Sequence, residues 1–414
     1  MTALETMGKN AKLAARVLAT AGAKKDKALL AMADALEAGE AEILAANQED
    51  LNAARAAGMS DSLLDRLALN HARIQGMAQG VRAVAAQSDP VGTVVGGSVR
   101  PNGLKIEQVR VPLGVIGIIY EARPNVTADA AALCLKAGNA VILRGGKEAF
   151  RSNQAVAQAM RSALEQVGLP KDCVQLVQDT SRSSAVEMMQ LTEYLDVLIP
   201  RGGKGLIQSV VQNSRVPVIE TGAGNCHVFV DESADLEMAA EIIFNAKTSR
   251  PSVCNAIETI LVHKKIAERA LPVIKARLDE KHVELRGCER TCAILGDSVL
   301  PATEEDWATE YLDYVLAVKV VDSLEEAMKH IARYSSGHSE AIVTESYRNA
   351  QRFTQEVDSA AVYVNASTRF TDGGEFGLGA EIGISTQKLH ARGPMGVNEL
   401  TSTKFIVTGS GQIR

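Results

Sequence analysis

The sequence predicts an α/β fold with two parallel sheets and a smaller β element. From residue 114 onward, short apolar strand-like runs alternate with helical patterns. That alternation is typical of a parallel sheet with helices on both faces. Earlier in the chain, Asn102-Gly103 separates two strand-like runs, which indicates a hairpin because both residues tolerate positive φ. A chain of 414 residues is also longer than one core of ~250–300 residues accommodates, so we expect two or three domains.

Composition and charge limit the class of function. The hydrophobic fraction of 46% and the charged fraction of 23% are typical of a soluble globular enzyme, and the net charge of −6 argues weakly against nucleic-acid or membrane-surface binding. The six cysteines form no CxxC pair, so their spacing predicts neither a zinc site nor a disulfide framework. The N-terminus does not resemble a secretory signal, and no apolar run approaches the ~18 residues of a membrane span. We therefore expect a cytoplasmic protein.

The order of the elements predicts the domain boundaries. Residues 1 to about 88 form an Ala-rich helical block, and the later strands are expected at 115–120, 140–143, 174–177, 195–199, 216–219, 226–230, 257–262, around 283, and at 293–295, 315–321, 341–344, 361–364 and 404–407. This order divides the chain into a first domain of residues 1–92 and 112–222 and a second of residues 223–400. Residues 93–111 and 401–414 remain as a hairpin and a tail strand. Open hairpin edges need covering, either by another subunit or by the hairpin's own domain.

Two strand ends carry the same tetrapeptide, Arg-Gly-Gly-Lys, each just before a helix. Glycines let a phosphate approach the backbone, a helix start offers free N–H groups, and Arg and Lys supply charge. One such turn is also an ordinary strand–helix connection, but two in one sheet favour a ligand with separated phosphates, such as NADP. The expected cofactor-binding residues are Arg144, Gly146, Lys147, Arg201, Gly202, Gly203 and Lys204.

One cysteine stands at a predicted helix-to-strand corner. A helical pattern runs to about Ala246, Pro251 prevents helical continuation, and Cys254 follows just before a strand-like run. A lone cysteine is often a small buried hydrophobe. Here the neighbouring cations Lys247 and Arg250 favour the thiolate, which is the nucleophilic form. The sequence therefore predicts a nucleophile at Cys254.

Several motifs resemble the aldehyde dehydrogenase superfamily over nearly the whole chain. Residues 111–125 are similar to its PLGVxGxI…N segment, residues 137–144 to AGNxVxLK, and residues 218–222 to LELGG. Cys254 falls at the position of the family nucleophile. Residues 330–342, HIARYSSGHSEAI, resemble a signature of the branch that reduces acyl phosphates. The Arg-Gly-Gly-Lys turn departs from the Lys-Pro-Ser-Glu turn of relatives that use NAD, which favours NADPH.

The resemblance implies an aldehyde dehydrogenase-like fold, with two Rossmann-like domains and a small β oligomerisation element in which hairpin and tail strand pair. It implies reduction of L-glutamyl 5-phosphate to L-glutamate 5-semialdehyde and phosphate, the second step of proline biosynthesis from glutamate. Cys254 would form a thioester, and Asn125 would stabilise the oxyanion. Glu310 would hold the nicotinamide ribose. Glu220 matches the base that activates water in oxidising relatives, and its role in reduction stays open.

Other polar residues are weaker candidates. Arg123 and Arg250 could hold the substrate carboxylate or phosphate, because an Arg fork matches both groups, or could form surface ion pairs. His338 could contact substrate or orient its loop, and a histidine in a Gly-Ser turn is usually exposed. We expect His227 to be structural. Cys134 and Cys226 are expected in the core.

Three functions remain in competition: the biosynthetic reductase, an NAD(P)-dependent dehydrogenase that oxidises another small aldehyde, and a nucleotide-binding module without catalysis. Turnover of an acyl phosphate with NADPH separates the first from the second, and loss of activity without Cys254 excludes the third. Expected partners are the small-molecule substrate, the upstream glutamate kinase through possible channelling, and further copies of the chain in a homo-oligomer.

Overall fold

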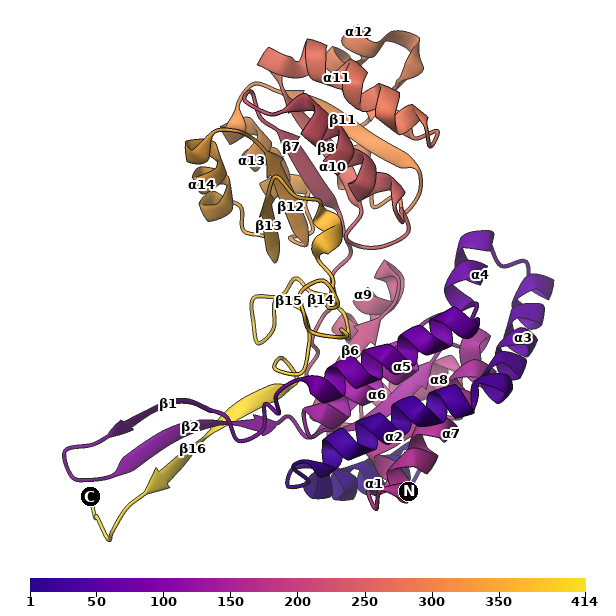
Figure 1. The fold of residues 1–414 in the computed structure, drawn as a ribbon, viewed down its shortest axis with the longest axis vertical. Helices are drawn as coiled ribbons and strands as arrows, with labels where there is room; N and C mark the ends of the chain where they lie inside the picture. Colours follow the sequence, from indigo (N-terminus) through magenta and orange to yellow (C-terminus); the bar gives the residue numbers. More distant parts are fainter. The chain divides into compact units, whose positions relative to one another are not determined.

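The computed structural model describes residues 1–414, apart from the side chain of Ser62. The chain forms two compact units (Figure 1). Unit 1 comprises 1–221, 377–383 and 395–414, and unit 2 comprises 222–376 and 384–394. Segments 377–383 and 395–400, which we expected in the second domain, group with the first instead. No helix among the described residues has the length and apolar character needed to cross a membrane.

Unit 1 begins with the predicted helical block. Its helices are α1 (Ala3–Leu18), α2 (Lys24–Ala38), α3 (Glu40–Ala56), α4 (Asp61–Leu67) and α5 (His71–Ala86). The first starts at a capping box, in which Thr2 and Glu5 satisfy each other's backbone N–H groups. Apolar residues at helical spacing, such as Ile74, Met77, Ala78 and Val81 of α5, are buried. Helices α2 and α5 pack on each other and on the helices that cover the sheet.

The parallel sheet of unit 1 has the order β5-β4-β3-β6. Its strands are β3 (Val115–Tyr120), β4 (Ala140–Gly145), β5 (Val174–Leu176) and β6 (Val197–Arg201), and its helices are α6 (Asn125–Lys136), α7 (Phe150–Gln166), α8 (Arg182–Met189) and α9 (Lys204–Asn213). The prediction of a strand at 216–219 is wrong. Only Val218 forms a bridge, to Leu198. Pro217 has no N–H group to extend the ladder.

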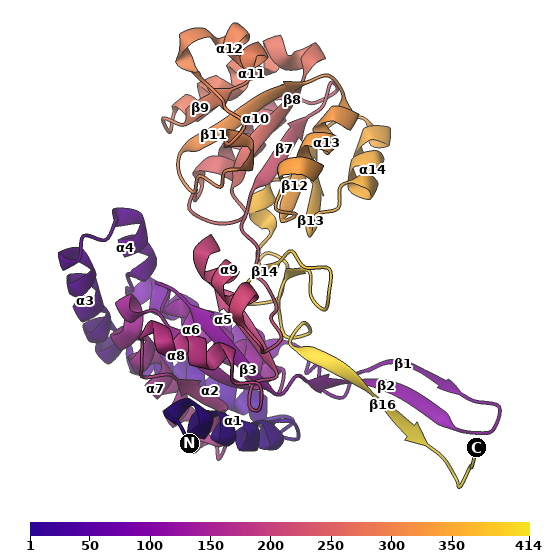
Figure 2. The same cartoon turned by 180° about the vertical axis from the view of Figure 1, so that it is seen from behind.

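The hairpin and the chain end form a separate antiparallel sheet, β1-β2-β16, as the resemblance implied. Strands β1 (Val94–Val99) and β2 (Lys105–Pro112) pair with each other, and β16 (Thr401–Thr408) pairs along the length of β2. The connecting turn places only Gly103 at positive φ, 88°. This sheet extends away from the helices of unit 1 (Figures 1 and 2), and most of its residues are exposed.

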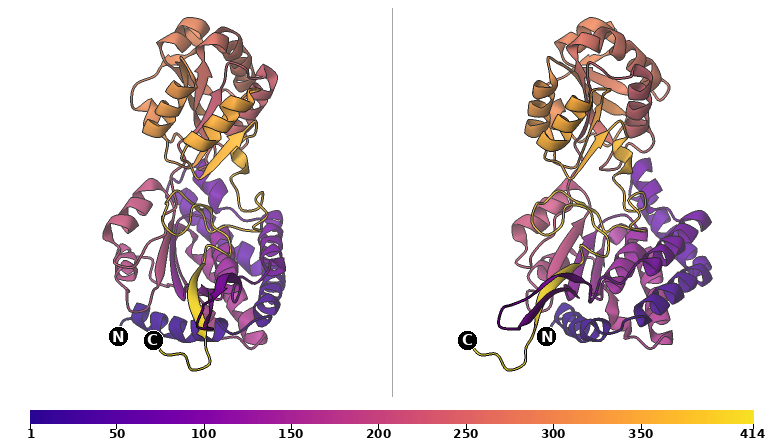
Figure 3. Two further views of the ribbon diagram at one scale, coloured as in Figure 1. Left: turned by 90° about the vertical axis from the view of Figure 1, so that its left-hand side faces the viewer. Right: turned by 60° about the vertical axis from the view of Figure 1, so that its left-hand side comes forward.

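Unit 2 is built on a seven-stranded parallel sheet of order β10-β9-β11-β8-β7-β12-β13. Helices lie on both sides of this sheet (Figure 3). Its strands are β7 (Cys226–Val230), β8 (Ile257–His263), β9 (Glu284–Gly287), β10 (Leu300–Pro301), β11 (Val315–Val321), β12 (Ser339–Val343) and β13 (Ala361–Val364), and its helices are α10 (Leu236–Thr248), α11 (Lys264–Asp279), α12 (Glu289–Leu295), α13 (Leu324–Tyr334) and α14 (Tyr347–Glu356).

One predicted strand of unit 2 is wrong. Residues 293–295 end helix α12, because the short apolar run continues a helical turn in which the Cys292 N–H donates to the Cys288 carbonyl at 2.9 Å. The glycine-rich stretch 367–400 is mainly irregular. It contains a short 3₁₀ turn (Thr368–Phe370) and two short strands, β14 (Ile384–Ser385) and β15 (Gly393–Pro394). The α/β fold with parallel sheets and a small antiparallel sheet is confirmed.

Candidate functional site

Cys254 lies at the predicted helix-to-strand corner of unit 2. Helix α10 ends at Thr248, three residues before Pro251, and strand β8 begins at Ile257. The thiol is half-buried. The corner lies at the amino ends of strands, because β7, β8 and β12 begin at residues 226, 257 and 339 and run parallel.

The backbone of Cys254 is held by the residues that lead into β7. A Cβ on Gly224 would lie 1.5 Å from the Cys254 carbonyl oxygen, so only glycine fits at this close approach. The Cys226 thiol donates to the same carbonyl, with Sγ and O 3.2 Å apart. The Gly224 N–H donates to Oε1 of Glu310 at 2.7 Å. Segments 224–226 and 310 therefore hold the corner in unit 2.

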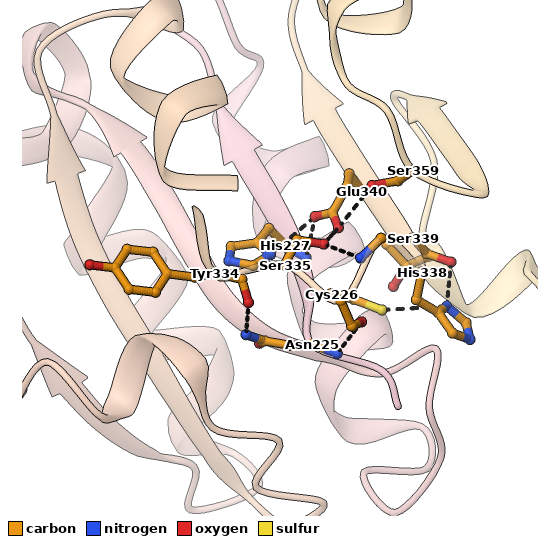
Figure 4. Close-up of polar contacts among 12 residues, drawn as sticks. Asn225, Cys226, His227, Tyr334, Ser335, His338, Ser339, Glu340 and Ser359 are labelled. Atoms are coloured by element: carbon orange, nitrogen blue, oxygen red, sulfur yellow. Dashed lines mark hydrogen bonds and ion pairs between the residues drawn. The ribbon is translucent and has the colours of Figure 1, made fainter. Parts of the chain in front are cut away.

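Cys226 thus contributes more than the core packing we expected. Burial raises the pKa of its thiol well above the usual value. A protonated thiol is the form that can donate to the Cys254 carbonyl. Its Sγ also lies 3.7 Å from Nδ1 of His338, as the close-up shows (Figure 4).

His338 is fully buried, so the expectation of an exposed histidine in a Gly-Ser turn is wrong. Its Nδ1 lies 2.8 Å from Oγ of Ser339, and Ser339 Oγ lies 2.7 Å from Oγ1 of Thr371. Thr371 continues the chain of hydroxyl contacts to the Tyr363 hydroxyl at 2.7 Å. His338 therefore belongs to a buried polar network under the corner.

A second buried network centres on Glu340 (Figure 4). The carboxylate accepts from the His227 backbone N–H at 2.9 Å and from the Ser335 hydroxyl. His227 Nδ1 is 3.1 Å from the carboxylate, within ion-pair distance but outside hydrogen-bond geometry. Asn225 Nδ2 donates to the Tyr334 carbonyl at 2.8 Å. These contacts fix the start of β7, which agrees with a structural role for His227.

The cationic environment predicted for Cys254 needs a correction at Lys247. This lysine is fully buried, and its Nζ donates to Glu258 Oε2 at 2.6 Å and to the Ile257 carbonyl at 3.1 Å. Burial lowers the pKa of Lys247 and raises that of Glu258 to about 7. Glu258 Oε1 also accepts from the N–H of Leu312, whose φ is 57°. The pair therefore supports the loop after Glu310 rather than the thiolate.

Arg250 and Arg369 carry positive charge in this corner. Arg250 is exposed on the turn itself. Arg369 comes from the irregular stretch after β13, and its charge interacts with those of Cys254 and Arg250. Sequence reasoning missed Arg369. Its only signal was a position at the start of a glycine-rich loop long enough to suggest function.

In unit 1, the first Arg-Gly-Gly-Lys turn begins in the last two residues of β4. Arg144 is half-buried, and its Nη2 donates to the carbonyls of Thr180 and Ser181, each at 2.7 Å. Burial lowers the pKa of Arg144. A Cβ on Gly146 would lie 2.0 Å from the Glu148 carboxylate, whereas Lys147 is exposed. Arg144 therefore shapes the turn, and Lys147 is the side chain free to reach a ligand.

The second turn follows β6. Gly203 caps helix α9, but its N–H already donates to Oε2 of Glu121 at 2.9 Å. Gly202 approaches the same carboxylate, and a Cβ there would lie 2.4 Å from it. Arg201 Nη2 is 3.6 Å from Glu381 Oε1, and Lys204 is exposed. A carboxylate oxygen thus stands at the helix start where a phosphate oxygen is expected, a feature that the tetrapeptide alone did not indicate.

Of the remaining predicted residues of unit 1, Arg123 and Asn125 follow β3, and Glu220 lies in the segment after α9. Asn125 is the exposed first residue of α6, and its Nδ2 donates to Oδ2 of Asp129 at 2.9 Å. Arg123 and Glu220 are half-buried. Ala122, two residues after β3, has φ 33°, and its N–H donates to Glu148 Oε1 at 2.7 Å. Such strained backbone is frequent at functional sites.

The turns of unit 1 fit a phosphorylated nucleotide cofactor. In the order β4-β3-β6, the carboxyl ends of three neighbouring strands bring both Arg-Gly-Gly-Lys turns to one edge of the sheet. That edge is where open α/β sheets bind their ligands. At the α9 N-terminus the Gly203 N–H already donates to the Glu121 carboxylate, so a phosphate bound there would replace that carboxylate oxygen. Lys147 and Lys204 would supply positive charge.

The chain belongs to the aldehyde dehydrogenase family, because the model of the "Aldehyde dehydrogenase family" matches residues 3–290. It is therefore an oxidoreductase of a family that uses a nicotinamide cofactor. Solved structures of the same fold include an engineered glycolyl-CoA reductase with bound NADP⁺, with TM-score 0.72 over 98% of this chain and 96% of that chain at 16% identity.

Within that family the chain is similar over its whole length to proteins named gamma-glutamyl phosphate reductase. It is 62% identical to the gamma-glutamyl phosphate reductase of Heliobacterium modesticaldum, over 99% of both chains. It is 61% identical to that of Moorella thermoacetica, over 99% of this chain and 98% of the relative. The crystal structure of gamma-glutamyl phosphate reductase from Thermotoga maritima matches with TM-score 0.96 and 53% identity over all of both chains.

Proposed function

We propose that this enzyme reduces L-glutamyl 5-phosphate to L-glutamate 5-semialdehyde and phosphate, as the second step of proline biosynthesis from glutamate. The observation that carries the proposal is identity above 60% along the whole chain to relatives named for this reaction. The corner of unit 2 supports it, because a half-buried thiol lies there and its charge interacts with that of Arg369.

The proposed reaction has two stages on Cys254. Its thiolate attacks the γ-carbonyl carbon, a carbon–sulfur bond forms, and the bond from carbon to the phosphate oxygen breaks. Asn125 and the Cys254 N–H are the proposed donors to the oxyanion, on the strength of the family motif. NADPH supplies a hydride when bound. The thioester carbon accepts it, the carbon–sulfur bond breaks, and the thiolate returns.

The proposed cofactor residues are those of the two turns, with Glu310 at the nicotinamide ribose. Lys147 and Lys204 are suited to the 2′-phosphate and pyrophosphate because they are exposed on glycine turns. Glu310 is the proposed partner of a ribose hydroxyl, and its Oε1 accepts from the Gly224 N–H. Arg144 would act by shaping its turn.

We further propose that the sheet β1-β2-β16 joins copies of the chain. It exposes apolar side chains that a partner would cover, among them Val94, Val99, Phe405 and Val407, which are 52%, 71%, 67% and 55% exposed. We also propose that the enzyme is cytoplasmic and that it receives its substrate by channelling from an upstream glutamate kinase.

A coupled assay tests the reaction. Glutamate, ATP and a glutamate kinase generate the unstable acyl phosphate, and NADPH oxidation is followed at fixed enzyme concentration. We expect NADPH oxidation that requires ATP, the kinase and this enzyme together. An enzyme that instead oxidises simple aldehydes without phosphate, and is inert in the coupled assay, would be a hydrolytic dehydrogenase.

A further inference from the structure

Arg369 lies in the short 3₁₀ turn Thr368–Phe370, which follows β13. Ser367 caps this turn, and its Oγ accepts from the Arg369 N–H at 3.3 Å. The buried Thr368 donates through Oγ1 to the Asn255 carbonyl at 2.7 Å. The turn is thereby fastened to the residue that follows Cys254.

The guanidinium reaches both sides of the Cys254 corner. Its Nε donates to Oγ of Ser249 at 3.0 Å, and its Nη1 donates to Oδ1 of Asn255. Asn255 in turn donates through Nδ2 to the carbonyls of Arg369 and Thr371, at 3.2 and 3.0 Å. These contacts fix the plane of the guanidinium, because a fork held at two nitrogens cannot rotate.

The third nitrogen of the Arg369 guanidinium, Nη2, does not anchor the side chain. Among the described residues, Nη2 of Arg369 has no hydrogen-bond partner. Asp372 and Glu375 are close enough for their charges to act on it, but the Asp372 carboxylate accepts from the Gly374 N–H at 2.8 Å. Arg369 is half-buried, and burial lowers its pKa, although a guanidinium remains charged.

The corner also needs positive charge for a physical reason. It follows the carboxyl end of α10, the negative end of the helix dipole, which does not stabilise an anion. Lys247 is neutralised by Glu258. Arg369 and Arg250 therefore supply the positive charge of the turn, and two guanidinium groups there suit an anionic ligand as well as the thiolate.

We propose that Arg369 binds an anionic oxygen group of the substrate next to Cys254, through the donors of Nη2. This inference rests on the proposed function and assigns a substrate-binding residue to it. The substrate carries two groups of this chemistry, the α-carboxylate and the 5-phosphate. Both are planar or tetrahedral oxyanions that a fixed guanidinium can bind.

The test uses the reverse direction, in which the two groups arrive on separate molecules. Wild type, Arg369→Gln, Arg369→Lys and the matched control Arg348→Gln are assayed with L-glutamate 5-semialdehyde, inorganic phosphate and NADP⁺. Arg348 is an exposed arginine on α14 of the same unit. The KM for each substrate is measured at saturating levels of the others.

We expect Arg369→Gln to raise one KM at least about tenfold, the effect of losing a charge-assisted hydrogen bond, and Arg348→Gln to leave both unchanged. A rise in the KM for phosphate would show that Arg369 binds the phosphate group. A rise in the KM for the semialdehyde would show that it binds the α-carboxylate. Both KM values within about twofold of wild type would overturn the inference. If wild type itself is inert, the proposed function fails instead.

Arg369→Lys keeps the inference testable if the Gln variant does not fold. Lysine retains the charge but loses the fork, so we expect an intermediate rise in the same KM. An aldehyde that lacks the α-carboxylate provides a second readout: if Arg369 binds that carboxylate, the Lys variant and wild type should share one KM for this analogue. Unchanged KM values for both natural substrates in a folded Lys variant would also refute the inference.

Discussion

The two parallel sheets of this protein differ in which strand ends carry the candidate residues: carboxyl ends in unit 1 and amino ends in unit 2. In unit 1 the Arg-Gly-Gly-Lys turns begin in the last residues of β4 and β6 and lead into a 3₁₀ turn and into α9. In unit 2 Cys254 precedes the amino end of β8, where the previous helix has ended. The first edge offers exposed lysines on glycine turns, which suit a phosphorylated ligand. The second edge follows the negative end of a helix dipole, and Gly224 and Cys226 hold the Cys254 carbonyl there.

The comparison shows two ways of building a site. A phosphate site needs positive charge and accessible backbone N–H groups, and small errors in their position change the binding affinity little. A nucleophile needs a fixed position, because a small misplacement of reacting atoms lowers the rate greatly. Accordingly, the Cys254 carbonyl meets Gly224 and Cys226, whereas Lys147 and Lys204 end in solvent.

The largest expected effect is at the nucleophile. Cys254→Ser should lower turnover by at least about a thousandfold, because an unassisted hydroxyl is a much weaker nucleophile than a thiolate. NADPH binding, followed by fluorescence titration, should remain. Cys292→Ser, at a half-buried cysteine on α12, is the matched control and should keep activity. Near wild-type turnover in Cys254→Ser would remove this residue from the mechanism.

The next effect tests whether the corner must be rigid. Gly224→Ala places a methyl group on the Cys254 carbonyl, so the turn must shift, and we expect turnover to fall by roughly a hundredfold, as misplacement of reacting groups can cause. Gly76→Ala in α5, where a Cβ meets nothing within 4 Å, should be neutral or slightly stabilising. Thermal melting and steady-state kinetics are measured together, and equal kinetics for the two variants would contradict a rigid corner.

A smaller effect is expected in the turns of unit 1. Lys147→Glu should reduce the preference for NADPH over NADH by about five- to tenfold, because an exposed charge contributes modestly. Lys281→Glu, an exposed lysine of unit 2, is the control for net charge. Arg144→Ala should also narrow the preference, but with a loss of stability, since it removes the bonds to Thr180 and Ser181. An unchanged cofactor ratio in Lys147→Glu would take this lysine out of the cofactor site.

The smallest effect on chemistry should follow from removing the exposed sheet's last strand. Deletion of residues 402–414 removes most of β16 but none of the proposed site residues. We expect both units to stay folded, the molar mass from light scattering to shift toward the monomer, and activity to fall chiefly through stability. A folded truncation with unchanged molar mass would exclude β16 from the subunit interface.

The sequence by itself predicted the α/β alternation, the helical N-terminal block, the hairpin and the helix-to-strand corner. These features depend on local rules, namely apolar periodicity, proline and glycine, and the Asn-Gly turn. The errors at 216–219 and 293–295 have the same origin, because a short apolar run fits a strand, a bridge or a helical turn equally well.

Only the tertiary structure decided which side chains meet. Lys247 lies close to Cys254 in the sequence, but it pairs with Glu258 in the core. Arg369 is more than a hundred residues from Cys254 in the sequence, but it contacts Asn255 at the corner. Likewise, the buried position of His338 and the carboxylate of Glu121 at Gly203 depend on strand order. The physical reason is that burial and charge pairing are set by contacts between distant segments, which no local pattern specifies.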